Sequence, residues 1–353
     1  MHNRAALERD RVERSSETRA LPSLLQIDVT GRCNMRCPFC YLAADAKPAL
    51  RHMSPRLIPL LHPALAAAET VTLYGTGEPL ASPHFDDFFL AAAATGARTY
   101  FTTNGTLLSP RVCDLLVNRL TYLSVSFSAG DAETFARVHG HDYFDRIVRN
   151  VEHLIREKEA SGTSHPRLRL SFVAARNTLG NLPGVIRLAE RLRCSEGVAV
   201  SYLVAYDEKE LANIAPNAPE EFREAHAAAG ALADSLGVPL AFKAAAPGVE
   251  AVPTCQRPWE AAFVRYDGDV FICTESAQHP LGSITTTDFQ DIWNGEAAVG
   301  FRTAFLSEPY LCCRYCNQCQ NKTSVERYAH LGGELWVREV TRLESGCASG
   351  GGA

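Results

Sequence analysis

The sequence predicts an α/β protein with a mostly parallel sheet, followed by a small cysteine-rich C-terminal domain. Short apolar segments alternate with amphipathic segments from residue 24 to about residue 203, a pattern typical of right-handed β-α-β units. Small polar residues follow the ends of several predicted strands, where barrel enzymes place their functional groups. From residue 255 onward the composition changes and cysteines recur.

Composition excludes several classes of protein. The chain has 353 residues, a formal net charge of −5 and a pI near 6.1, so it offers no basic surface for nucleic acid. It has no apolar run of about 18 residues that would span a membrane, and its charged N-terminus lacks an apolar signal core. Its 12 cysteines lie mostly in tight clusters, which indicates metal ligands in a reducing cytoplasm rather than disulfides.

The first cysteine cluster follows the first predicted strand. Residues 1–22 are charged and are expected to form an N-terminal tail or a short lead-in helix, and residues 24–29 form a short apolar strand. The loop behind it places Cys33, Cys37 and Cys40 in the spacing C-x3-C-x2-C. Three thiolates suit a soft metal centre, and three ligands on a four-iron cluster leave one iron open, as in catalytic metal sites. A zinc site or a chance cluster is the alternative.

This loop resembles the signature of the radical S-adenosylmethionine (radical SAM) enzymes, in which an aromatic residue, here Phe39, precedes the last cysteine. The resemblance implies that Cys33, Cys37 and Cys40 hold a [4Fe–4S] cluster and that SAM chelates its open iron. It implies that Phe39 contacts SAM, that a 5′-deoxyadenosyl radical abstracts a substrate hydrogen, and that flavodoxin or ferredoxin donates the electron. For residues 23–210 it implies a partial (β/α)6 TIM-like barrel.

The next elements in order are a helix and a second strand. Ser54 and Pro55 provide a cap and a first position for a helix that runs to about residue 68. A strand over residues 71–74 ends in Gly75-Thr76-Gly77-Glu78-Pro79, where glycines permit close approach of a ligand. This segment resembles the GGEP motif of the family with Thr76 in place of the second glycine, which implies that Gly75, Thr76, Gly77 and Glu78 bind the amino group of SAM. An ordinary β-to-α turn is the alternative.

The alternation then continues to a sixth strand. Helices are predicted over 85–94, 109–118, from Asp131, 143–160 and 182–192, and strands over 98–103, 122–126, 168–174 and 198–203. Asn104, Ser126 and Arg176 follow three of these strands and are predicted to contact bound SAM, although such residues also cap loops and helices. Ser128 stands where relatives often carry Asp.

The C-terminal region contains the second cysteine field. Residues 211–254 form a linker with an Ala-rich helix over 220–236 that ends at Gly237. Asp267-Gly268 predicts a hairpin that follows Cys255 and carries Cys273 on its return strand, and Cys312-Cys313-Arg314-Tyr315-Cys316-Asn317-Gln318-Cys319 follows. The spacing C-x12-G-x4-C followed by C-x2-C resembles the SPASM/Twitch extension of radical SAM enzymes, here over 255–325.

This second resemblance implies one auxiliary [4Fe–4S] cluster, since too few cysteines remain for two. Its expected ligands are Cys255, Cys273, Cys316 and Cys319, with Cys313 and Cys316 as a rival second pair. A structural zinc ion held by four cysteines is the alternative. Residues 326–353 are expected to form a helix and a flexible tail.

Four other residues invite interpretation. Cys113 and Cys194 are expected to be structural thiols within helical segments. His139, near the predicted barrel mouth, and Glu275, two residues after Cys273, are candidate substrate contacts.

The predicted function is hydrogen abstraction from an unactivated C–H bond of a small-molecule or peptide substrate. The first hypothesis is an oxidoreductase that dehydrogenates an aminoglycoside- or aminocyclitol-like sugar in natural-product biosynthesis. Alternatives are a sugar epimerase, with Cys312 or Cys313 as hydrogen donor, and a maturase of ribosomally made peptides. A zinc-binding interaction module is the non-enzymatic alternative.

Overall fold

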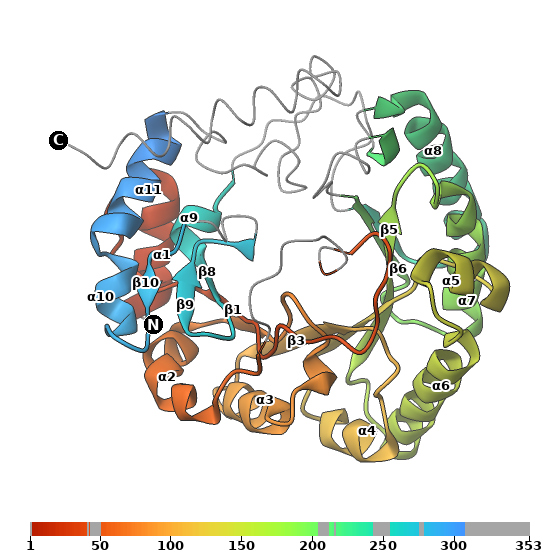
Figure 1. Cartoon of the computed structure of the whole chain (residues 1–353), viewed down its shortest axis with the longest axis horizontal. Coiled ribbons are helices and arrows are strands. Elements are labelled where there is room, and N and C mark those ends of the chain that lie inside the picture. The colour runs from red at the N-terminus through yellow and green to blue at the C-terminus, as the bar shows by residue number, and fades with distance from the viewer. Residues whose placement is uncertain are drawn as a thin grey trace.

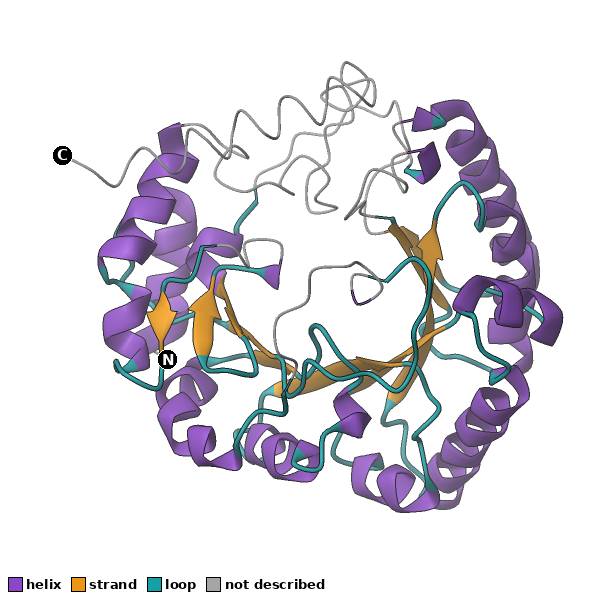
Figure 2. Cartoon of the chain, viewed as in Figure 1, coloured by secondary structure: helices purple, strands orange, loops and turns teal. Residues whose placement is uncertain are grey.

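A computed structural model describes residues 2–40, 42, 51–203, 212–214, 217–242, 255–274 and 279–307. These residues form one ten-stranded sheet in the order β10-β9-β8-β1-β2-β3-β4-β5-β6-β7. The sheet curves around an interior, and most of the helices lie on its convex side (Figures 1 and 2). The strands are β1 (Leu24–Ile27), β2 (Thr70–Thr72), β3 (Arg98–Thr103), β4 (Tyr122–Ser126), β5 (Arg167–Ala174), β6 (Val198–Tyr202), β7 (Leu240–Phe242), β8 (Ala261–Val264), β9 (Asp269–Phe271) and β10 (Gly282–Ser283).

The helices follow the strands in the order that the sequence predicts. Ser54, Ser109 and Asp131 each accept a backbone N–H bond as helix caps, and Gly237 ends α8 in the left-handed conformation with φ 64°. The helices are α1 (His2–Glu13), α2 (Ile58–Ala67), α3 (Phe85–Ala93), α4 (Pro110–Leu116), α5 (Ala132–His139), α6 (Phe144–Ala160), α7 (Leu182–Arg191), α8 (Pro219–Leu236), α9 (Arg257–Glu260), α10 (Phe289–Trp293) and α11 (Glu296–Ser307), with short 3₁₀ turns η2 (Pro55–Leu57), η3 (Pro79–Ala81) and η4 (Leu179–Asn181).

The strands from β8 through β1 to β7 are all parallel, which confirms the barrel-like α/β fold. The sheet is wider than the six strands expected from the sequence. Residues 211–254 were expected to be a helical linker, but β7 within them pairs with the far edge of β6, and β8 pairs with β1 on the other edge. The predicted Asp-Gly hairpin is present as β8 and β9, so it continues the barrel sheet. Parallel partners far apart in sequence leave no local signal, because no turn joins them.

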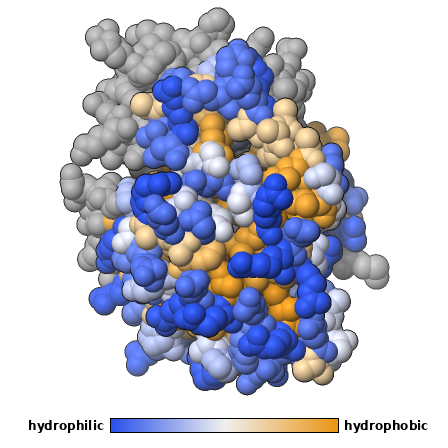
Figure 3. Space-filling view, turned by 90° about the vertical axis from the view of Figure 1, so that its right-hand side faces the viewer, coloured by the Kyte–Doolittle hydropathy of each residue, from blue (hydrophilic) through white to orange (hydrophobic). Residues whose placement is uncertain are grey.

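Side chains alternate between two environments along the strands. Phe101 of β3 and Leu170 of β5 belong to the buried core beneath the helices, while Tyr100 and Arg169 point the other way, into the barrel interior. The outer helices are amphipathic: α6 buries Phe144, Ile147, Val148, Val151, Leu154 and Ile155. On the side that carries α5 to α8, hydrophilic and apolar residues are therefore interspersed (Figure 3).

The N-terminal segment, residues 2–20, is ordered and packs against the rest of the fold. Residues 2–13 form α1, and the carboxylate of Asp10 accepts the backbone N–H groups of Arg19 and Ala20 at 2.8 and 2.9 Å. The indole N–H groups of Trp259 and Trp293 donate to the carbonyls of Ser15 and Ala20 at 2.7 and 2.9 Å. The segment thus joins the helices α9 and α10 at the C-terminal part of the described chain.

Candidate active site

The three cysteines of the first motif lie in the loop that follows β1. Two of their sulfur atoms accept backbone N–H groups: Cys33 from Met35, and Cys40 from Leu42, both at 3.4 Å. The sulfur of Cys37 lies 3.4 Å from Nδ1 of His139. N–H donors around cysteine sulfurs are the surroundings in which proteins hold iron–sulfur clusters.

The electrostatics of this loop also suit a metal cluster. Burial raises the pKa of Cys33, and burial together with the neighbouring Cys40 and Cys33 raises the pKa of Cys37 to about 12. Positive iron would compensate the thiolate charges that crowd here. In the part of the chain that the structure describes, no three His, Cys, Asp or Glu side chains converge on a point where one metal ion would bind. A cluster does not require that, because each thiolate binds a different iron.

The GTGE segment is joined to the cysteine loop by backbone hydrogen bonds. The N–H groups of Gly77 and Glu78 donate to the carbonyls of Thr30 and Arg32 at 3.0 and 2.9 Å. A Cβ atom on Gly77 would overlap with the carbonyl of Arg32. Only glycine therefore permits the contact between the two loops that the family resemblance assigns to the cluster and to SAM.

Glu78 is buried, with 3% of its surface exposed. Its carboxylate accepts 2.7 Å hydrogen bonds from the hydroxyl of Thr103 and the backbone N–H of Asn104, and a third bond from the N–H of Leu80 at 3.2 Å. Burial nevertheless raises the pKa of Glu78 to about 7. The carboxylate thus fixes the end of β3 against the GTGE segment, a role that the sequence motif does not reveal.

Thr76, the departure from the GGEP motif, has a partner of its own. Its backbone N–H donates to the carboxylate of Asp28 at 3.1 Å, and its side chain also acts to lower the pKa of that carboxyl group. Asp28 is 1% exposed, and burial raises its pKa to about 6 in spite of these interactions. Gly75 packs against the same side chain, since a Cβ there would stand 2.5 Å from Cγ of Asp28. Thr76 and Asp28 together hold the segment in place.

Asn104 lies between the GTGE segment and the cysteine loop. Its backbone binds Glu78, and its amide nitrogen donates to Oδ1 of Asn34 at 2.9 Å and lies 3.9 Å from the sulfur of Cys33. Its amide oxygen accepts two bonds from Thr106. The sequence indicated only that Asn104 ends a strand; the structure places it against the cluster loop.

The other predicted SAM contacts lie in different surroundings. Ser126 ends β4 beside Ser171 of β5, and Phe39 packs against the small cluster of Ala175, Leu203 and Ile214. Arg176 forms a two-point ion pair with Glu221 of α8 at 2.6 and 3.0 Å, with both side chains about half exposed. Contact of these residues with SAM stays a prediction. To bind SAM, Arg176 would have to break its ion pair with Glu221 or bind both groups at once.

Ser128 and His139 are both buried. Ser128 is 2% exposed, and its hydroxyl accepts the backbone N–H of Val173 at 3.3 Å, so it supports the loop. His139 is 3% exposed and lies behind Cys37. This buried position is wrong for the substrate contact expected from the sequence. Helix α5 places His139 beside Cys37, and no pattern in the neighbouring sequence indicates the contact between these two residues.

The barrel interior is lined with hydroxyl groups around one arginine. The guanidinium of Arg169 donates to the hydroxyl of Tyr100 at 2.6 Å and to that of Ser124 at 3.3 Å, and it stacks over the Tyr100 ring at 5.0 Å. Tyr100 in turn bonds Thr102 at 2.8 Å. No carboxylate of the described residues forms an ion pair with Arg169. Among the described residues, the hydrogen-bond partners of Arg169 are neutral hydroxyl groups. A half-buried guanidinium in such surroundings is stabilised when an anionic group binds next to it.

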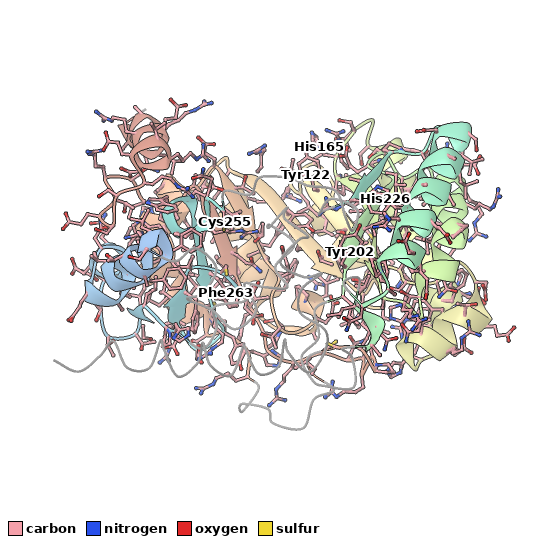
Figure 4. All side chains as sticks on the ribbon, turned by 90° about the horizontal axis from the view of Figure 1, so that it is seen from above. Tyr122, His165, Tyr202, His226, Cys255 and Phe263 are labelled. Atoms are coloured by element: carbon pink, nitrogen blue, oxygen red, sulfur yellow. The ribbon has the colours of Figure 1, made fainter. Side chains whose placement is uncertain are left out.

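Two of the predicted auxiliary ligands, Cys255 and Cys273, flank the β8–β9 hairpin. Val270 packs into the core beneath α10, so Phe271 lies on the opposite, interior side of the hairpin, and Cys273 follows two residues after the end of β9. Phe271 contacts Phe263 there at a ring distance of 5.9 Å. Cys255 and Phe263 lie on one side of the barrel, and Tyr202 and His226 on the other (Figure 4). The remaining candidates, Glu275, Cys312, Cys313, Cys316 and Cys319, lie outside the described residues.

Comparison with known proteins agrees with this geometry. The radical SAM superfamily matches residues 27–163, and the SPASM iron–sulfur cluster-binding domain matches residues 255–320. Both matches contain the cysteine loops described above. The chain belongs to the radical SAM superfamily and carries a C-terminal SPASM domain. Membership implies SAM, the [4Fe–4S] cluster that binds it and auxiliary iron–sulfur ligation, and the cysteine surroundings fit such clusters.

Three relatives illustrate the range of the similarity. The tungsten-containing aldehyde ferredoxin oxidoreductase cofactor-modifying protein of Pyrococcus furiosus is 24% identical over 348 residues, which is 89% of this chain and 92% of that protein. The uncharacterized protein MJ0804 of Methanocaldococcus jannaschii is 28% identical over 195 residues, so the match spans only 60% of its length and 54% of this chain. The structure of Streptococcus suis SuiB bound to S-adenosylmethionine superposes with a TM-score of 0.67 at 14% identity, over 92% of this chain and 80% of SuiB.

One further observation concerns the helices. Within the described ranges, none combines the length and the apolar character that crossing a bilayer requires.

Proposed function

We propose that the protein is an oxidative radical SAM enzyme that removes hydrogen from a substrate carbon and passes an electron to its auxiliary cluster. The single observation that carries this proposal is the position of Cys273. It follows two residues after Phe271, the interior-facing last residue of β9, and β9 belongs to the sheet whose strand β1 leads into the cysteine loop. An auxiliary centre held from this side would face the same interior as the substrate.

In this proposal Cys33, Cys37 and Cys40 hold the catalytic cluster, and the segment from Gly75 to Glu78 binds the amino group of SAM. When bound, the cluster and SAM would supply the 5′-deoxyadenosyl radical, and the auxiliary cluster would supply an electron acceptor. For a carbinol substrate, the carbon loses one hydrogen atom, which 5′-deoxyadenosine keeps. The hydroxyl loses one proton, the remaining electron leaves, and a carbonyl group results.

The described residues would position the substrate rather than react with it. Tyr100 and Thr102 present hydroxyl groups to the interior, and such groups suit a hydroxylated substrate. Arg169 adds a positive charge among them. A sugar or cyclitol substrate in natural-product biosynthesis fits this lining best if it carries an acidic group, because an added ammonium group would be repelled.

Modification of a peptide is the second candidate, because Arg169 would equally accept a carboxylate of a peptide. SuiB has also been solved with its precursor peptide SuiA, and its TM-score with this chain is 0.62 at 14% identity, a likeness that concerns the fold. Sugar epimerisation has no described residue in its favour. It differs from dehydrogenation in that the product would carry one solvent-derived hydrogen without net oxidation.

The test is a cluster count in a variant that lacks the catalytic cluster. The Cys33/Cys37/Cys40 triple alanine variant, reconstituted without oxygen, is expected to keep about four irons and a reduced [4Fe–4S] EPR signal. Adding Cys273→Ser should remove that signal, whereas adding Cys113→Ser should preserve it, because Cys113 lies in the buried core. A triple variant without iron, or with zinc in its place, would refute the electron-acceptor role.

The chemistry is tested separately with SAM and dithionite. Wild-type protein is expected to form 5′-deoxyadenosine, and Cys37→Ala is expected to form none. If both form equal amounts, the protein does not use Cys37 in SAM cleavage. If the wild-type protein cleaves no SAM, the result would favour the alternative that the protein is a zinc-binding interaction module.

A further inference from the structure

His139 has two hydrogen-bonding partners that together determine where its proton resides. It is the last residue of α5 and is enclosed by aromatic rings: it stacks on Phe135 at 4.2 Å and meets the edge of Phe39 at 5.5 Å. The backbone N–H of Ser128 points at Nε2 from 3.2 Å, and the sulfur of Cys37 lies 3.4 Å from Nδ1. The ring therefore bridges the loop after β4 and the cysteine loop after β1.

The tautomer follows from this network. A backbone N–H can only donate, so Nε2 must accept and carries no proton. The proton of the neutral ring is then on Nδ1, where it points at the sulfur of Cys37. Ser128 cannot readily turn away, because its hydroxyl accepts from Val173 at 3.3 Å and its carbonyl accepts from Asn181 at 3.4 Å.

We propose that His139 is a positioning residue for the catalytic cluster: its Nδ1–H donates to the Cys37 thiolate, fixes that sulfur and raises the reduction potential of the cluster. Reduction adds one negative charge to the cluster and its sulfurs. An N–H dipole aimed at a ligating sulfur stabilises the more negative state, and hydrogen bonds to sulfur are an established control of cluster potentials. Burial strengthens the effect, since no bulk water screens the dipole.

The contact differs from the closest donors at the other two sulfurs. Cys33 and Cys40 accept N–H groups from Met35 and Leu42, within their own loop, and Cys33 has a longer contact, 3.9 Å, with the amide nitrogen of Asn104. The donor to Cys37 belongs to helix α5, 102 residues later in the chain. His139 therefore couples the position of α5 to the cluster, which a backbone donor within the loop does not do.

The same region supplies a matched control. His141, two residues further on, accepts the backbone N–H of Arg36 at 2.9 Å through Nε2 and has no cysteine partner among the contacts of the described residues. It supports the same loop and stacks on Tyr143 at 5.3 Å. Replacing His141 therefore perturbs the loop without removing a donor to sulfur.

The experiment is a redox titration of the anaerobically reconstituted holoenzyme, followed by EPR of the reduced catalytic cluster. His139→Phe keeps the stacking and removes the donor. It is expected to bind as much iron as wild type and to shift the midpoint potential to a more negative value. His141→Phe should leave the potential unchanged, and His139→Gln, which restores an N–H donor, should recover part of the shift. Equal potentials for wild type and an iron-replete His139→Phe would overturn the proposal.

A second measurement does not depend on any His139 variant folding. Wild-type protein labelled with ¹⁵N histidine is reduced and examined by pulsed EPR. A weak ¹⁵N hyperfine coupling and an exchangeable proton coupling are expected at the catalytic cluster, and both should persist in His141→Phe. Their absence in wild-type protein would overturn the proposal, as would their loss in His141→Phe.

Discussion

Gly77 and Arg32 lie so close together that a Cβ atom on Gly77 would overlap with the carbonyl group of Arg32. The same carbonyl accepts the N–H of Glu78 at 2.9 Å, so the GTGE segment and the cysteine loop form one backbone-bonded unit. The site that binds SAM in the proposed function is therefore set by backbone contacts as much as by side chains.

Gly77→Ala is expected to separate these two loops. Inserting a methyl group against fixed backbone should lower the free energy of unfolding by roughly 1–3 kcal/mol and reduce the iron bound after reconstitution. Urea unfolding and iron analysis would measure both effects. Gly230→Ala is the control, because no atom lies within 4 Å of its added Cβ, and alanine favours the interior of α8. A Gly77→Ala protein with wild-type stability and iron content would contradict the close contact.

Glu78 should make stability depend on pH. Burial raises its pKa from 4.5 to about 7, so the folded state favours the protonated form. Its contribution is fully present below pH 4.5 and is lost as the pH rises through about 7. That rise in pKa corresponds to at most about 3 kcal/mol at 1.36 kcal/mol per pH unit. The free energy of unfolding of wild-type protein should therefore fall relative to that of Glu78→Gln between pH 5 and 8.

Urea titrations at several pH values would measure this difference. Glu78→Gln changes the hydrogen bonds with Thr103 and Asn104 by an amount that does not vary with pH, so the slope is the informative quantity. Asp28, with its own pKa raised to about 6 by burial, titrates in both proteins and cancels. Parallel pH profiles would mean that Glu78 stays ionised throughout.

Thr76 should prove to be coupled to Asp28. Thr76→Val removes the hydroxyl that lowers the pKa of the buried Asp28 carboxyl group and should cost about 1 kcal/mol of stability. Thr76→Ser keeps the hydroxyl and should cost less. In a double-mutant cycle with Asp28→Asn, we expect a coupling energy of similar size above pH 6, where the carboxyl group is ionised. Additive effects of the two substitutions would show that Thr76 does not support Asp28.

Arg176 tests the predicted SAM carboxylate contact against the observed ion pair. If Arg176 holds SAM, Arg176→Gln should weaken SAM binding by about tenfold, the loss of about 1.4 kcal/mol. Glu221→Gln should not weaken it, because it frees the guanidinium from its partner on α8. Equilibrium dialysis of the reconstituted protein with labelled SAM would measure both. Unchanged binding in Arg176→Gln would leave the residue a purely structural role.

The sequence predicted the elements whose signals are local. The residues 98–103 and 122–126 are strands with those bounds, and Asp131 caps the helix expected after it. A strand is indicated by the alternation of apolar residues, and a helix start by its capping residue. Both signals lie within a few consecutive residues, so they can be recognised before the fold is known. The cysteine loop and the GTGE segment were equally local, and the structure brings them together.

Contacts between distant residues could not be predicted in this way. The pairing of β8 with β1 and the hydrogen bond between His139 and Cys37 join segments more than 100 residues apart. Arg176 was predicted to contact SAM from the end of a strand, because nothing near it in the sequence indicated its ion pair with Glu221. These partners depend on how the helices pack around the sheet, which no short window of sequence encodes.

Arg302 offers the last prediction, because it joins the N-terminal segment to the C-terminal helices. Its guanidinium has 0% exposure, and burial lowers its pKa to about 10. It donates to the carbonyls of Pro258, Trp293 and Ser16 at 2.8, 2.9 and 3.2 Å and stacks over the Trp293 ring at 4.6 Å. Lysine cannot reproduce this planar set of donors.

Arg302→Lys should therefore leave buried carbonyls unpaired and lower the free energy of unfolding by about 3 kcal/mol, as measured by urea denaturation. The N-terminal segment should also become sensitive to limited proteolysis, because Ser16 loses its partner. Arg111→Ala, which removes an exposed ion pair with Asp86, is the control and should cost less than about 1 kcal/mol. If Arg302→Lys matched that control, Arg302 would not be what holds the N-terminal segment to α10 and α11.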